Sequence, residues 1–138
     1  MSGQPSIQEA LIYLMVVISA VDRDMTDSEL ARIGDIIRTL PVFRSFDESH
    51  VVDVARQCQQ MLQQENGPER VLDLVRDTVP VGMHDTAYAL AVEVAAADLH
   101  VEPEEERMLQ ILRSRLQIEP LVAAAIGRAA RARHRHFS

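Results

Sequence analysis

Two acidic turns of this 138-residue chain carry carboxylate pairs at the same spacing, Asp22 with Glu29 and Asp98 with Glu105. More acids surround both pairs, namely Asp24, Asp27, Glu102, Glu104 and Glu106. Clustered carboxylate oxygens suit hard divalent cations, so calcium, magnesium or manganese fits this pattern better than zinc. The residue types therefore predict a divalent-cation site at the turns.

The first turn does not fit an EF-hand loop. Asp22, Asp24 and Thr26 match its first, third and fifth positions, but Asp27 replaces the required glycine and Ile33 replaces the final glutamate. The second turn fits less well. A cation bound at these turns would therefore need a different arrangement of ligands.

Glu93 is a further carboxylate, and it interrupts the apolar segment 89–97. It lies at an edge facing water, pairs with an arginine, or is buried with a raised pKa. If its helix is central, it could also join one metal site made of Asp22, Glu29, Glu93, Asp98 and Glu105. Glu93 and a turn aspartate could alternatively act as acid and base in an enzyme.

A purely structural role competes with metal binding. Thr26 and Glu29 have the spacing of a capping box, and each aspartate could accept hydrogen bonds from the turn amides that follow it. An aspartate ending a helix opposes the helix dipole, which costs about 0.3–1 kcal/mol unless the charge is paired. The second turn has Glu102 where the first has Thr26, so Asp98 and Glu105 are the better metal candidates.

Both turns lie inside an internal repeat that joins residues 11–40 to residues 87–116. Placing Asp22 on Asp98 gives an offset of 98 − 22 = 76, which also aligns Glu29 with Glu105. Apolar residues at helical spacing in both copies place these carboxylates on the inward sides of two helical hairpins. The repeat predicts an all-α, bundle-like domain covering residues 1–138.

About seven helices and no strand are predicted. Capping boxes at Ser6 and Thr26 start the first two, which end near Asp22 and before Pro41. Later helices are predicted over residues 51–64, 69–78, 85–98 and 103–116, with a last one from residue 120 into an arginine- and histidine-rich tail, residues 128–138. The apolar run 10–21 is too short for a membrane span, which needs about 20 residues.

Composition limits the classes of function. The net charge is −7, and the tail holds four arginines and no acid, so the remainder carries −7 − 4 = −11. Such a body repels nucleic acid and attracts cations or basic partners. The tail could contact an acidic partner, lipid headgroups or this acidic body. A single cysteine, Cys58, and the absence of a signal-peptide pattern fit a reducing, cytoplasmic setting. No catalytic motif is present, so we expect no enzymatic activity.

The segments AVDRDMTDSE and VAAADLHVEPEEE resemble the tellurite-resistance TerB-like family, which also includes the N-terminal domain of a membrane-anchored J-domain co-chaperone. The resemblance implies an all-helical domain with two pseudo-repeated units. It also implies a metal site, here Asp22, Glu29, Glu93, Asp98 and Glu105. The implied role is cytoplasmic stress response or sensing, with protein partners in a complex near the inner membrane and with a homodimer as one form. The alternative is a metal-free interaction module whose carboxylates are structural. Arg23 and Leu99 stand where the family usually has glycine, so the turns differ.

Overall fold

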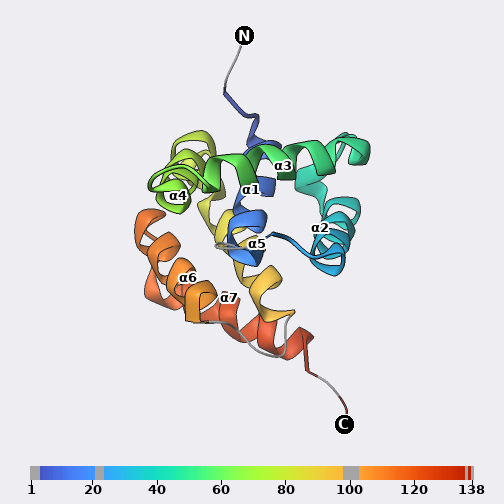
Figure 1. Cartoon of the computed structure of the whole chain (residues 1–138). Helices are drawn as coiled ribbons and strands as arrows, with labels where there is room; N and C mark the ends of the chain where they lie inside the picture. Colours follow the sequence, from blue (N-terminus) through green and yellow to red (C-terminus); the bar gives the residue numbers. More distant parts are fainter. Residues whose placement is uncertain (1–3, 21–23, 98–102, 136, 138) are drawn as a thin grey trace.

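A computed structural model describes residues 4–20, 24–97, 103–135 and 137. These residues form seven α-helices and three short 3-10 helices and contain no strand, which confirms the all-α prediction (Figure 1). The α-helices are α1 (Ile7–Ser19), α2 (Asp27–Thr39), α3 (Val51–Leu62), α4 (Gly67–Thr78), α5 (His84–Ala96), α6 (Pro103–Arg115) and α7 (Pro120–Arg133). The 3-10 helices are η1 (Pro41–Phe43), η2 (Glu48–His50) and η3 (Val81–Met83).

The helices begin where the sequence carries start signals. Ser6 caps α1 by accepting a 3.1 Å hydrogen bond from the Glu9 backbone N–H, and Glu9 Oε1 accepts one of 2.9 Å in return. Asn66 takes a left-handed conformation, with φ of 58°, immediately before α4. Proline occupies the first turn of α4 and α7, where its missing N–H leaves no helical hydrogen bond unmade.

Several helices end earlier than predicted, and one of them, predicted over residues 51–64, ends at Leu62. Two others are the first helices of the repeated hairpins. The helix expected to reach Asp22 ends at Ser19, because Ala20 adopts φ −150° and ψ 62°, outside the helical region. The helix expected to reach Asp98 ends at Ala96. Neither end carries the glycine that commonly marks a helix C-terminus, so its position was poorly defined by sequence.

The second helices of the two repeated segments match in position, whereas α1 and α5 are offset by 84 − 7 = 77 at their starts. The first and last residues of α2 and α6 differ by 103 − 27 = 76 and 115 − 39 = 76, which equals the repeat offset. In Figure 1, α1 and α5 occupy the middle of the molecule, and α2 and α6 lie on opposite sides of them. The two acidic turns therefore belong to hairpins whose second helices are separated by the central pair.

The core is centred on α1, whose residues from Ala10 to Ser19 are all buried. It packs against α3, α4 and α5, while α5 also packs against α6 and α7 (Figure 1). Residues 10–19 of the apolar run 10–21 lie in this buried helix. No helix in the described parts of the chain is long and apolar enough to cross a membrane.

Candidate functional site

The carboxylate of Glu29 is held at the first turn of α2. The backbone N–H of Thr26 donates a 2.9 Å hydrogen bond to Glu29 Oε1, and the Glu29 N–H donates one of 3.2 Å to Thr26 Oγ1. This reciprocal pair confirms the predicted capping box. Only 6% of Glu29 is exposed, so its carboxyl group lies almost completely inside the protein.

Glu105 occupies the equivalent position in the second hairpin. It is the third residue of α6, as Glu29 is the third residue of α2, and only 4% of it is exposed. Glutamate is rarely this buried, and burying a carboxylate requires compensating hydrogen bonds, cations or helix-dipole interactions. The inward direction inferred from helical phasing is therefore correct for both glutamates.

The structure describes only three of the five predicted metal ligands, Glu29, Glu93 and Glu105. Asp22 and Asp98 lie outside the described residues. Among the residues that are described, no group of three or more His, Cys, Asp or Glu side chains is placed to hold a metal ion, so Glu29, Glu93 and Glu105 do not together form such a group. Binding of calcium, magnesium or manganese at the turns remains a prediction.

Glu93 contacts the end of the last helix. The Arg133 guanidinium donates to Glu93 Oε1, and His134 Nε2 lies 2.6 Å from Glu93 Oε2. Burial by itself raises the pKa of Glu93, but the hydrogen bonds and positive charges of Arg133 and His134 outweigh burial and leave its pKa lowered. Of the alternatives considered for Glu93, the structure shows pairing with an arginine, and the alternative of a raised pKa is wrong.

The partners of Glu93 were not identifiable from local sequence, because Arg133 and His134 are 40 and 41 residues away along the chain. The available signal was the charge contrast between the basic tail and the acidic remainder. Three targets were considered for the tail, and the structure shows contact with one of them. Arg133 and His134 of the tail contact the acidic body of this protein at Glu93.

Two other reactive residue types have structural environments. Cys58 is fully buried, burial raises its pKa to about 12, and its thiol lies 3.5 Å from the Tyr13 carbonyl oxygen, to which it donates. Its thiolate is therefore suppressed at neutral pH. His84 is buried, and its Nε2 lies 2.9 Å from the Val79 carbonyl oxygen, so it ties the start of α5 to the preceding segment.

These features define an all-helical domain built on a duplicated hairpin, with a buried glutamate at the start of the second helix of each copy. Residues 8–126 match the model of the family described as tellurite resistance protein TerB, and the chain belongs to this family. It is therefore a tellurite-resistance-related domain. No match to the chain was found among curated proteins or among solved structures.

Proposed function

We propose that this TerB-family domain is a non-enzymatic module that binds or senses a divalent cation at its two acidic turns. The observation that supports this most is the burial of Glu29 and Glu105 at the same position of α2 and α6. Both hairpins thus retain a carboxylate where an aliphatic side chain would be less costly to bury. A bound cation would contact a glutamate at the same position in both hairpins.

We propose two separate sites, because α2 and α6 lie on opposite sides of α1 and α5 (Figure 1). The ligands would be Asp22 with Glu29 in one site and Asp98 with Glu105 in the other. Glu93 is not included because its two carboxylate oxygens already contact Arg133 and His134. Calcium, magnesium and manganese are the cations that prefer such oxygen ligands.

Calorimetry and thermal unfolding of chelator-treated protein test this proposal. Titration with calcium, magnesium or manganese should give heat for at least one of them and raise the melting temperature. A cation at one hundred times its dissociation constant stabilises the fold by about 2.7 kcal/mol. Glu105→Gln should reduce the response, whereas Glu104→Gln, an exposed neighbour in the same turn, should not. No heat and no melting shift with any of the three ions would exclude the cation site.

The second candidate is a metal-free interaction module whose acidic body binds a basic partner. The complete capping box of Glu29 favours it, since the box alone gives that glutamate a structural role. Glutamine also supports a capping box, so Glu29→Gln should then leave stability unchanged and chelators should have no effect. In either case we propose a cytoplasmic stress-response role within a protein complex.

A further inference from the structure

A cavity of about 620 Å³ opens between α5, α6 and α7, and its lining includes Ala96, the last residue of α5, and Glu106, one of the acids of the second turn. Sites for small molecules typically measure about 300–1,000 Å³ and combine an apolar lining with a few polar groups. Apolar and aromatic side chains from α5 and α6 line this cavity, including Tyr88, Val92, Ala95 and Leu109. Its size and lining are therefore those of a small-molecule site.

The rim of this cavity is basic, although the protein as a whole carries a charge of −7. Arg131, His134 and Arg135 contribute to the lining, against one acid, Glu106. Within the described parts of the chain, Arg131 and Arg135 form no ion pair with any carboxylate, whereas their neighbour Arg133 pairs with Glu93. Two guanidinium groups are thus left available for an anion from outside the chain.

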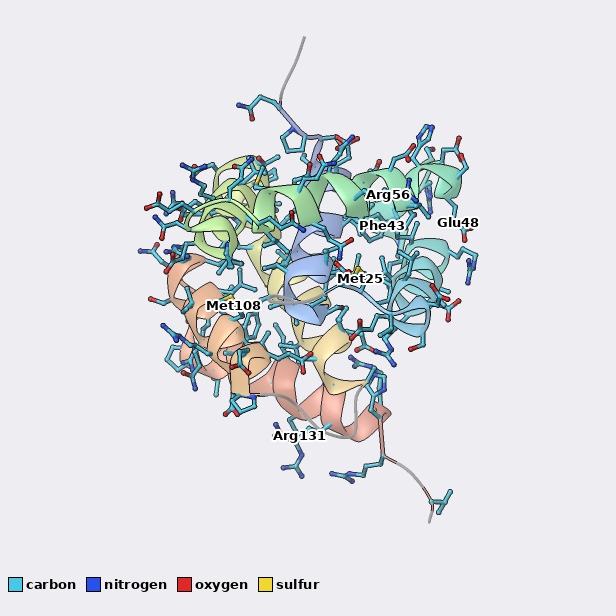
Figure 2. The ribbon with its side chains drawn as sticks, in the orientation of Figure 1. Met25, Phe43, Glu48, Arg56, Met108 and Arg131 are labelled. Carbon is cyan, nitrogen blue, oxygen red and sulfur yellow. The ribbon has the colours of Figure 1, made fainter. Side chains whose placement is uncertain are left out.

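Contacts with α5 hold the end of α7, where the basic residues of the cavity rim lie. Arg133 and His134 are fixed to Glu93 of α5, while Arg131 projects from α7 near the edge of the molecule (Figure 2). Gly127 lies one helical turn before Arg131 on the same face of α7 and also lines the cavity. A side chain at position 127 would extend into space that is now empty, because its Cβ would meet only the Arg131 guanidinium, at 3.6 Å.

Tyr88 adds a polar group to the apolar wall. It is 9% exposed, and its hydroxyl makes no hydrogen bond to any residue in the described segments. Although Tyr88 is buried as a residue, its hydroxyl reaches solvent, so it is accessible to a ligand atom that enters the cavity. A second hollow, of about 390 Å³, lies beside η1 and has no tyrosine in its lining. Its Arg38 is already paired with Asp35 and Glu48, so it is the weaker candidate for an anion.

We propose that the cavity between α5, α6 and α7 binds a small amphipathic carboxylate. The planar guanidinium groups of Arg131 and Arg135 match the geometry of a carboxylate, with which arginine forms paired hydrogen bonds. The short apolar body of the ligand would lie against Val92, Ala95 and Leu109, where it replaces water on an apolar surface. The cavity shares Glu106 with the acids around the second turn, so the anion is tested with divalent cations removed.

Calorimetric titration of the full chain, with chelator present to remove divalent cations, tests the two halves of the ligand separately. Octanoate should bind with one equivalent per chain. Octan-1-ol, which lacks the charge, should bind at least tenfold more weakly, and acetate, which lacks the apolar body, should give no saturable heat. Absence of octanoate binding, or equal affinity for octanoate and octan-1-ol, would overturn the proposal.

Two pairs of variants locate the binding. The double variant Arg131→Gln/Arg135→Gln should weaken octanoate at least tenfold, whereas Arg128→Gln, on the same helix but not lining the cavity, should not. Gly127→Leu should fill the cavity and block binding, whereas Gly127→Ala should preserve it. Circular dichroism confirms that each variant is folded. Wild-type affinity in folded Arg131→Gln/Arg135→Gln or in folded Gly127→Leu would refute this location.

Discussion

Replacing Glu93 by glutamine should loosen the end of α7 from α5. Glutamine keeps the size of the side chain and removes the charge that faces Arg133 and His134. The exposed fractions of the three side chains are 26% for Glu93, 28% for His134 and 56% for Arg133. The histidine contact is therefore better shielded from water than the arginine contact.

The magnitude follows from these exposures. An ion pair with one exposed partner contributes about 0.2–1 kcal/mol, which we assign to Arg133. A hydrogen bond to a charged group contributes about 1.5 kcal/mol to the free energy of unfolding when it is shielded from water. Because His134 is partly exposed, solvent screening lowers its contribution below this value. Glu93→Gln should therefore lower the free energy of unfolding by about 1–2 kcal/mol, which corresponds to about 3–8 °C in melting temperature.

The effect of Glu93→Gln should depend on pH in a defined direction. The pKa of Glu93 is lowered in the folded protein from an ordinary value of 4.5, so the unfolded chain binds more protons as the solution is acidified. The stability contributed by the charge is thus fully present above about pH 4.5 and is lost as the pH falls through the folded pKa. The difference between wild type and variant should shrink over that acidic range.

Urea unfolding of wild type, Glu93→Gln, Arg133→Gln and the double variant measures the coupling directly. The exposed loop variant Glu65→Gln is a control and should change stability by less than about 0.5 kcal/mol. A coupling energy of at least about 0.5 kcal/mol is expected for residues in contact. Additive single effects, or a Glu93→Gln penalty unchanged from pH 7 to pH 3, would refute the ion-pair explanation.

Three further predictions concern stability and reactivity. Gly67→Ala should cost about 1–3 kcal/mol in urea unfolding, because its Cβ would lie 2.5 Å from two backbone carbonyl oxygens, whereas Gly82→Ala meets nothing within 4 Å and should be nearly neutral. Leu112→Ala, at a fully buried site, should cost about 2–5 kcal/mol, whereas Leu121→Ala, at a site 82% exposed, should stay within about 0.5 kcal/mol. Cys58 should resist a disulfide reagent at pH 8 in native protein and react in denaturant, since burial raises its pKa to about 12; rapid native labelling would contradict this.

Sequence patterns located the helices because their starts carry chemical signals. Ser6 and Thr26 cap helices through local hydrogen bonds, and proline marks the beginning of α7, so only a few neighbouring residues decide each start. Helix ends lacked an equivalent signal, so the ends of α1 and α5 were predicted too late in the chain. The burial of Glu29 and Glu105 was predictable from helical phasing alone.

The contacts of Glu93 could not be obtained in this way. They join Glu93 of α5 to Arg133, the last residue of α7, and to His134, which follows it. Periodicity within one helix does not specify which of the 14 arginines approaches Glu93. The cavity beside them was equally hidden, because its lining comes from three helices. Tertiary packing, which single-helix patterns do not encode, determines both features.

The Glu93 contact also explains where the two copies of the repeat diverge. Its counterpart 76 residues earlier is Val17, which is fully buried within α1. α1 packs against α2, α3, α4, α5 and α6, whereas α5 has α7 across one of its faces. A carboxylate is tolerated at position 93 because Arg133 and His134 contact it and because its side chain is 26% exposed. A carboxylate at position 17 would be completely buried, since Val17 is 0% exposed. The two copies therefore share the buried glutamate at the third position of the second helix. They differ at Glu93, which contacts the basic tail beside the cavity.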